Sequence, residues 1–250
     1  MDYHINDAQW EDISSFFRSV KGLHSHSPEK LRIFVEGVWF ILRTGVQWRH
    51  LPPCYGAWSS IHRKFKRWSD RGLWQNLFQA VQREPDLEHV MLDSTIVRAH
   101  SCAAGLKKAS QNEEALGRSK GGFTTKIHAV VDALGNPLSF VLTPGQRQDI
   151  TQAPEMIGDF SESKILADKG YDANALIEQL QEQSCEPVIP PKKNRKEQRF
   201  YDRDIYKERH LIECFFGKLK HYRRVFSRFE KSASAFLSFL SFAGALIWLR

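Results

Sequence analysis

Residues 89–97 have the sequence His-Val-Met-Leu-Asp-Ser-Thr-Ile-Val, in which an apolar run leads directly into an acid, Asp93. Short runs rich in apolar and β-branched side chains are typical of buried strands. A second run, residues 164–167, leads into Asp168 in the same way. The two stretches predict two strands of one sheet, each with an aspartate at its end, where α/β folds bind ligands.

The chain between and after these strands predicts the rest of the sheet. Two apolar runs, residues 124–132 and 138–143, flank a turn that contains Gly135-Asn136-Pro137, which indicates an antiparallel hairpin. Residues 174–183 then have a helical pattern, and residues 187–189 predict a further strand. A hairpin-led mixed sheet followed by alternating helices and strands indicates an α/β layer fold.

Residues before this region predict helices. One helix begins at Ser27-Pro28 and ends near Gly45, and another begins near Ser59. The latter has an apolar stripe, and its other faces carry Arg63, Lys64, Lys66 and Arg67. This pattern is typical of a helix-turn-helix DNA reader, although a three-helix bundle with a solvated basic face fits it equally. The expected domains are therefore residues 1–84, helical and DNA-binding, and residues 85–250, α/β.

Composition and charge limit the class of protein. Hydrophobic residues make up 42% of the 250 residues and charged residues 26%, as in ordinary globular domains. The net charge is +7, and residues 192–231 alone contain 14 Lys and Arg against 6 Asp and Glu. A basic chain favours a polyanionic partner, but charge alone does not distinguish DNA from RNA or a membrane surface.

Two further features concern the cellular compartment. The four cysteines are scattered and form no CxxC pair, which argues against a zinc site or a disulfide framework and indicates reduced thiols in a cytoplasmic protein. Residues 233–249 carry no charge, yet they are fewer than the roughly 20 residues that a bilayer requires. We therefore expect a buried C-terminal helix and no membrane partner.

A third candidate acid comes from helical geometry. In a helix over residues 206–222, Tyr206, Arg209, Glu213 and Lys220 would lie within an arc of about 60°. An Arg209–Glu213 pair on a solvated face is the simpler interpretation. Large apolar residues surround Glu213 on both sides, however, which favours a functional stripe over a solvated one.

Three carboxylates that meet at one site need a cation between them. Oxygen-only ligands favour Mg²⁺ or Mn²⁺, and two such ions about 4 Å apart suit in-line phosphoryl transfer. Arg209 and Lys220 would then hold DNA phosphates. Asp132 has a simple explanation as a turn residue, whereas Asp149 and Asp172 remain alternatives for the middle acid.

The spacing Tyr206-x2-Arg209-x3-Glu213-x6-Lys220 resembles the Y-R-E-K signature of DDE transposases in the insertion-sequence-four/five superfamily. The blocks around Asp93 and Asp168 resemble the family's first and second catalytic blocks, the latter followed by Gly170-Tyr171. Further stretches resemble the insertion-sequence-five branch: residues 42–52, 117–122, 132–137, 143–146 and 188–191. Taken together, the resemblance covers essentially the whole chain.

The resemblance implies a ribonuclease-H-like catalytic domain, a mixed sheet flanked by helices, with the triad Asp93, Asp168 and Glu213. It also implies Mg²⁺ or Mn²⁺ as cofactor and a homodimer or larger assembly. The partner would be double-stranded DNA, both terminal inverted repeats and target. A nuclease that cuts without joining, a repurposed DNA-binding regulator and a basic RNA-associated structural protein are the alternatives. Glu208 adds an acid beside Arg209 and is expected to point away from the stripe.

Overall fold

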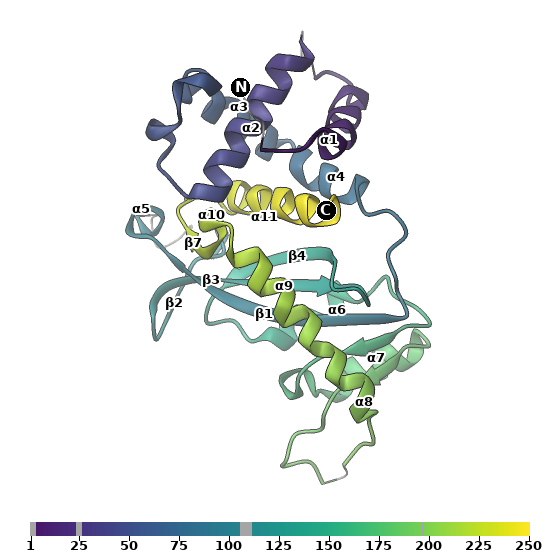
Figure 1. The fold of residues 1–250 in the computed structure, drawn as a ribbon. Coiled ribbons are helices and arrows are strands. Elements are labelled where there is room, and N and C mark those ends of the chain that lie inside the picture. The colour runs from purple at the N-terminus through teal and green to yellow at the C-terminus, as the bar shows by residue number, and fades with distance from the viewer. Residues whose placement is uncertain (1–3, 24–26, 106–111, 197) are drawn as a thin grey trace. The chain divides into compact units, whose positions relative to one another are not determined.

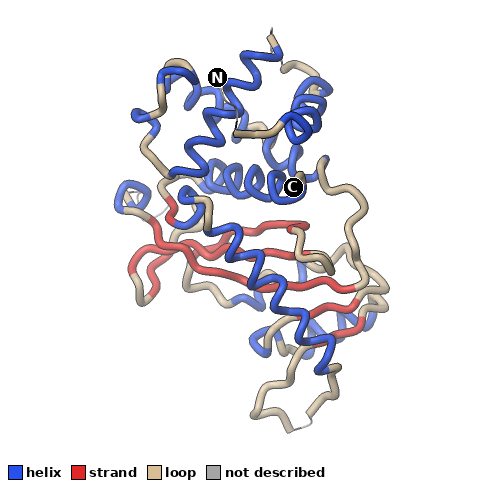
Figure 2. Tube along the Cα trace, in the orientation of Figure 1, coloured by secondary structure: helices blue, strands red, loops and turns tan. Residues whose placement is uncertain are grey.

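The computed structural model describes residues 4–23, 27–105, 112–196 and 198–250. Within these residues the chain forms two compact units. The helical unit falls within Met1–Arg83, Ala99–Leu106 and Leu219–Arg250, and the sheet unit within Glu84–Arg98 and Lys107–Lys218. Figure 1 labels elements of both units where there is room, and Figure 2 colours helices and strands differently.

The helical unit consists almost entirely of helices. Its α-helices are α1 (Asp7–Ser19), α2 (Pro28–Thr44), α3 (Trp58–Asp70), α4 (Leu73–Ala80), α5 (Ser101–Ala104), α10 (Arg223–Phe226) and α11 (Ala233–Trp248). It also has two 3-10 helices, η1 (Trp48–His50) and η2 (Pro53–Tyr55), and the two-residue strand β7 (Ser227–Arg228).

Local sequence sets the helix ends of this unit. The Ser27 side chain accepts a hydrogen bond from Lys30 N at the start of α2, and Gly45 ends the helix in a left-handed conformation with φ of 71°. Both ends lie where the sequence predicts them. Helix α3 begins at Trp58, one residue before the expected start, and buries Phe65 and Trp68. The helix-turn-helix character of α1–α4 stays a prediction.

Helix α11 supplies much of the core of this unit. Phe239 stacks on Phe65 with ring centroids 4.4 Å apart, and Phe242 lies 4.8 Å from Trp74. A helix that is apolar all round is stable only inside a core, and these aromatic rings provide one. The expected domain of residues 85–250 therefore differs from the observed division, because residues 219–250 belong to the helical unit. Among the described residues, no helix has the length and apolar character that a bilayer crossing requires.

The sheet unit has a mixed sheet with strand order β2-β3-β1-β5-β6, and β4 also pairs with β3. Its strands are β1 (His89–Ala99), β2 (Gly117–Ser119), β3 (Gly122–Val131), β4 (Pro137–Pro144), β5 (Lys164–Leu166) and β6 (Glu186–Val188). Its helices are α6 (Ala153–Met156), α7 (Asn174–Glu182), α8 (Arg203–Tyr206) and α9 (His210–Lys220), whose last two residues fall in the helical unit.

Helices cover both faces of this sheet, as the sequence predicts. Val90 and Leu92 of β1 pack in one core cluster with α6 and α7. On β4, Val141 joins that cluster, while the neighbouring Phe140 stacks on Phe215 of α9 with ring centroids 6.0 Å apart. Because successive strand residues face opposite sides, α9 covers the other face, across which it runs in Figure 1.

The register of β1 corrects one expectation. Asp93 is not at a strand end, because β1 continues to Ala99 and pairs with β3 as far as Arg98↔Thr124. Thr95, Ile96 and Val97 are β-branched and sustain this pairing. Only the parallel pairing with β5 ends early, at Met91↔Leu166. Asp93 lies two residues after Met91, and Asp168 lies two residues after Leu166. The two aspartates therefore follow the end of this parallel pairing, one on each of the two paired segments.

Candidate active site

Asp168 lies two residues beyond the end of β5 and is held by the backbone of the turn that follows it. It caps a 3-10 turn, Lys169–Tyr171, and its Oδ1 accepts a hydrogen bond from Gly170 N at 2.7 Å. A Cβ on Gly170 would lie 2.8 Å from the same oxygen, a distance that real Cβ atoms do not adopt. The glycine that follows Asp168 therefore leaves room for the carboxylate.

The segment that carries Tyr206, Arg209 and Glu213 is less regular than a single helix. Helix α8 ends at Tyr206, residues Lys207–Arg209 form a 3-10 turn, and α9 runs from His210 to Lys220. Such turns are common at α-helix N-termini. The expected helix over residues 206–222 is therefore tightened at its start and ends two residues early.

Arg209 joins two of the predicted catalytic acids. Its Nη2 lies 2.8 Å from Asp93 Oδ2, and its Nη1 lies 2.5 Å from Glu213 Oε1. The Arg209 and Asp93 side chains are 17% and 18% exposed, whereas Glu213 is 59% exposed. The structure thus brings Asp93, Arg209 and Glu213 together in one hydrogen-bonded group.

The other two residues of the predicted stripe are placed differently. Tyr206 is half-buried, and its pKa is raised by burial and by the negative charges of Asp168 and Asp93, while Arg209 opposes the shift. Tyr206 therefore lies in the electrostatic field of both aspartates. Lys220 is the last residue of α9, belongs to the helical unit and is half-buried.

Glu208, the additional acid beside Arg209, has a partner of its own. Its Oε2 lies 2.5 Å from His89 Nδ1, at the start of β1. The Arg209 guanidinium instead contacts Glu213 and Asp93. In this structure Glu208 therefore points to His89 rather than to the group around Arg209.

Burial dominates the electrostatics of Asp93. Loss of solvent raises its pKa, and the charges of Asp168 and Asp149 raise it further. The Ser94 backbone N–H, 2.7 Å from Asp93 Oδ1, and the Arg209 guanidinium lower the pKa. Burial thus makes ionisation of Asp93 less favourable, and the Arg209 guanidinium partly offsets this effect.

Asp149 is a neighbour of this site that the sequence left undecided. Its Oδ1 accepts a hydrogen bond from Ser94 Oγ at 2.7 Å and lies 2.8 Å from Lys126 Nζ. Ser94 directly follows Asp93 in β1, so Asp149 contacts the residue next to the first predicted acid. Lys126 and the serine beside Asp93 are the residues that sequence reasoning missed, and no spacing in the sequence connects them to Asp149.

The two other competing acids have structural roles. Asp172 is buried and bonds to Arg195, Arg199 and Lys192 N. Asp132 accepts hydrogen bonds from Leu134 N and Asn136 N, as expected of a residue in the hairpin turn. Asp172 therefore ties its loop to the segment after β6, whereas Asp132 stabilises the turn that contains it.

The donor atoms at this site fit Mg²⁺ or Mn²⁺, since Asp93, Asp168 and Glu213 offer only carboxylate oxygens. The arrangement of these three side chains in the structure is less suited to holding an ion than their chemistry is. In the described part of the chain, no three His, Cys, Asp or Glu side chains are grouped to hold a metal. Between Asp93 and Glu213 the structure has the Arg209 guanidinium.

The four basic residues predicted to contact DNA are on α3 in the helical unit. Arg63, Lys66 and Arg67 are exposed. Lys64 instead lies over aromatic rings, with its Nζ 4.2 Å from the centroid of Phe34 and 4.9 Å from that of Trp68. Three of the four are therefore free of such packing, while Lys64 packs its ammonium group against the rings of Phe34 and Trp68.

Two family profiles match the sequence. The family described as "Transposase DDE domain" matches residues 84–248, and "Putative transposase of IS4/5 family" matches residues 5–78. The chain is 43% identical over 131 residues to "Putative transposase for insertion sequence element IS6501" of Brucella ovis, which covers 51% of this chain and 99% of the relative. It is 31% identical over 135 residues to the corresponding IS402 protein of Burkholderia cepacia, over 49% of this chain and 62% of that one.

Solved transposase structures are more distant. A piggyBac transposase synaptic complex with hairpin DNA has a TM-score of 0.43 at 10% identity, over 77% of this chain and 50% of that chain. The catalytic domain of Mos1 mariner transposase has a TM-score of 0.28 at 12% identity, over 65% and 91% of the two chains. A likeness at these TM-scores establishes neither the fold nor the function of this chain.

The family match covers the sheet, α9 and the three predicted acids, so the chain belongs to the transposases with a DDE domain. The match over residues 5–78 and the relatives from insertion sequences narrow this to transposases of the IS4/5 type.

Proposed function

We propose that this protein binds the terminal inverted repeats of an insertion sequence, cleaves the DNA ends and joins them to target DNA. Asp93, Asp168 and Glu213 are the catalytic carboxylates. The observation that carries the proposal is the contact of one guanidinium with both Asp93 and Glu213. Asp168 follows the end of β5, the strand that pairs with the start of β1. Membership of the DDE family supports the same reaction class.

The same three carboxylates would hold the divalent ions that this family uses, Mg²⁺ or Mn²⁺. Bound ions would supply an activated water and would stabilise the negative charge of an in-line displacement at phosphorus. The protein's own contribution is orientation: the Ser94 and Gly170 backbone N–H groups fix Asp93 and Asp168. Arg209, once released from the acids, would be free to bind a DNA phosphate.

The partner in this proposal is double-stranded DNA, held by a homodimer or larger assembly that brings two element ends together. The exposed Arg63 and Arg67 of α3 would contact phosphates. Tyr206 and Lys220 would also contact the DNA backbone.

Cleavage and strand transfer of inverted-repeat DNA by the full chain with Mg²⁺ would test this function. Asp93→Asn, Asp168→Asn and Glu213→Gln should each abolish both steps while DNA binding persists. Glu208→Gln is the matched control, since Glu208 is in the same segment but bonds to His89, and it should retain cleavage. Persistent activity in the three variants would refute the triad, and cleavage without joining would identify a nuclease instead.

A further inference from the structure

Asp149 is tied to the strand that carries Asp93. Its Oδ1 accepts a hydrogen bond from Ser94 Oγ at 2.7 Å and lies 2.8 Å from Lys126 Nζ. Lys126 is on β3 with a side chain that is 9% exposed, and its Nζ also donates to Arg147 O at 2.6 Å. Because salt screens a partly buried pair less than an exposed one, the Lys126–Asp149 pair holds the Asp149 carboxylate in place beside Ser94.

This contact is made on the face of the sheet opposite to the one that carries the Asp93 side chain. Successive residues of a strand point to opposite faces, so Ser94 and Asp93 point to different sides of β1. Leu92 points to the same side as Ser94 and packs in the core cluster with α6 and α7. Asp93 points to the side that α9 covers, where it contacts Arg209. Asp149 therefore contacts β1 from behind the strand, as seen from the Asp93 carboxylate.

The hydrogen bond from Ser94 to Asp149 restricts the peptide unit that orients Asp93. Ser94 N donates to Asp93 Oδ1 at 2.7 Å, so the direction of this carboxylate depends on the peptide unit between the two residues. The pairing of β1 with β5 ends at Met91↔Leu166, before this peptide unit is reached. The bond from Ser94 Oγ to Asp149 therefore adds a restraint where the restraint from β5 has ended.

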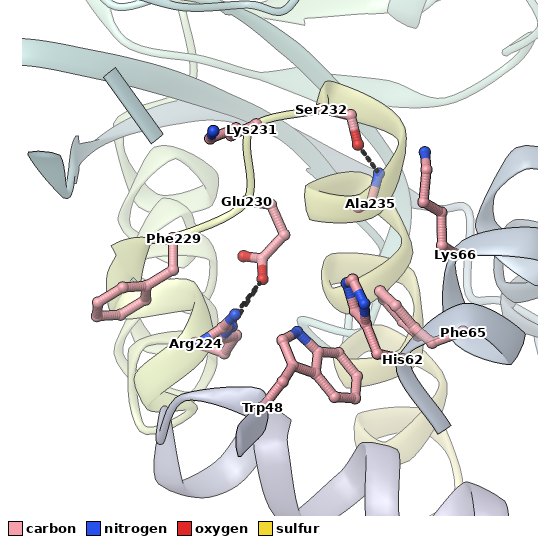
Figure 3. Close-up of a pocket in the computed structure, with 10 residues that line it drawn as sticks. All are labelled: Trp48, His62, Phe65, Lys66, Arg224, Phe229, Glu230, Lys231, Ser232 and Ala235. Carbon is pink, nitrogen blue, oxygen red and sulfur yellow. Dashed lines mark hydrogen bonds and ion pairs between the residues drawn. The ribbon is translucent and has the colours of Figure 1, made fainter. Parts of the chain in front are cut away.

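The connection to a predicted acid distinguishes this pair from an ion pair of the helical unit. There Arg224 Nη2 lies 2.7 Å from Glu230 Oε1, and both residues line the pocket that Figure 3 shows. That pair belongs to the helical unit, whereas the predicted catalytic acids belong to the sheet unit. The Lys126–Asp149 pair is in the same unit as these acids and is connected to Asp93 through one serine.

We propose that Asp149 is a positioning residue for Asp93. It holds the Ser94 hydroxyl, and the Ser94 N–H in turn fixes the direction of the Asp93 carboxylate. The inference rests on the proposed function, because it requires Asp93 to be a catalytic carboxylate that binds an ion. Residues that orient an ion-binding side chain typically contribute roughly 10- to 100-fold to metal affinity or activity, which sets the size of the expected effects.

Ser94→Ala removes the hydroxyl and leaves the Lys126–Asp149 pair in place. In the full chain it should lower kcat for DNA cleavage by roughly tenfold at unchanged KM, because DNA still binds while Asp93 is less well oriented. Ser94→Thr keeps a hydroxyl and should restore most of the rate. Ser139→Ala, at another half-buried serine of the same sheet, is the matched control and should cleave normally. A wild-type rate for folded Ser94→Ala protein would overturn the proposal.

Asp149→Asn tests whether the acid acts through this serine. The variant weakens the contacts to Ser94 and Lys126 and should lower kcat by roughly 10- to 100-fold. The double variant with Ser94→Ala should be no slower than Asp149→Asn alone, because both changes break the same connection. Asp159→Asn, at an exposed acid of the same unit, is the control. Circular dichroism verifies folding, and effects that multiply in the double variant would refute action through Ser94.

Mn²⁺ binding in the absence of DNA, followed by electron paramagnetic resonance, separates positioning from direct coordination. Ser94→Ala and Asp149→Asn should each weaken Mn²⁺ binding by roughly tenfold. Loss of binding in Asp149→Asn with wild-type affinity in Ser94→Ala would make Asp149 an ion ligand and would overturn the proposal. Asp93→Asn is the reference variant. Cleavage that persists in it refutes the catalytic triad, whereas its loss together with normal cleavage by Ser94→Ala refutes the positioning role alone.

Discussion

The Arg209 guanidinium lies 2.8 Å from Asp93 Oδ2, and the same group contacts Glu213. It therefore places one positive charge between these two carboxylates. A divalent ion between them would have to replace the arginine, because both neutralise the same acids. This competition leads to the first prediction.

Arg209→Gln should bind Mn²⁺ more tightly than the wild-type protein, by roughly tenfold, since a neutral side chain does not compete. With a chelator present, the variant should be less stable by on the order of 3 kcal/mol, because Asp93 loses its buried partner. Mn²⁺ titration followed by electron paramagnetic resonance, together with urea unfolding, measures both effects. Arg203→Gln, at an exposed arginine of α8, is the control. Equal or weaker Mn²⁺ binding by folded Arg209→Gln protein would contradict the competition.

The pH dependence of stability should include a contribution from His128. This side chain is fully buried, its Nε2 lies 2.8 Å from Thr143 Oγ1, and burial lowers its pKa to about 4. Below pH 6.5 the His128 imidazole is protonated in the unfolded chain but stays neutral in the folded chain. The free energy of unfolding should therefore fall between pH 6.5 and about 4, by roughly 3 kcal/mol in total.

Urea unfolding of His128→Asn across this pH range checks the assignment. In the variant, the free energy of unfolding should depend less steeply on pH, because the uptake of about one proton on unfolding is lost. His221→Asn, at an exposed histidine, should keep the wild-type slope. A wild-type slope in the His128 variant would mean that other groups cause the acid sensitivity.

Local signals in the sequence were sufficient for both ends of α2 and for the hairpin of β3 and β4. Ser27, Pro28 and Gly45 set α2 through their own backbone preferences, and the hairpin of β3 and β4 follows from its turn residues. The features that the sequence did not predict depend on contacts between residues that are far apart in the chain. The place of α11 beside Phe65 and Trp74, and of Asp149 beside Ser94, is set by tertiary packing. Period and spacing do not encode such contacts.

Gly170→Ala should impair DNA cleavage without unfolding the protein. The new methyl group would lie 2.8 Å from Asp168 Oδ1 and would displace the carboxylate. A displacement of about 1 Å at a catalytic group lowers rates by roughly 100-fold. Gly217→Ala is the control, because nothing lies within 4 Å of its added Cβ and alanine favours a helix. Cleavage assays on both variants, at equal thermal stability, make the comparison, and wild-type rates for Gly170→Ala would argue against a catalytic Asp168.

The basic residues of α3 should differ in whether they contact DNA. Arg63 and Arg67 are exposed, so Arg63→Gln and Arg67→Gln should each reduce the slope of log Kd against log salt by about one, the loss of one phosphate contact. Lys64→Gln should leave the slope unchanged and lower stability by about 1 kcal/mol, because the Lys64 ammonium packs over Phe34 and Trp68. Binding of inverted-repeat DNA at several salt concentrations measures the slopes. If Lys64→Gln alone changed the slope, the DNA-contacting face of α3 would be the one that carries Lys64, and the assignment of Arg63 and Arg67 would be wrong.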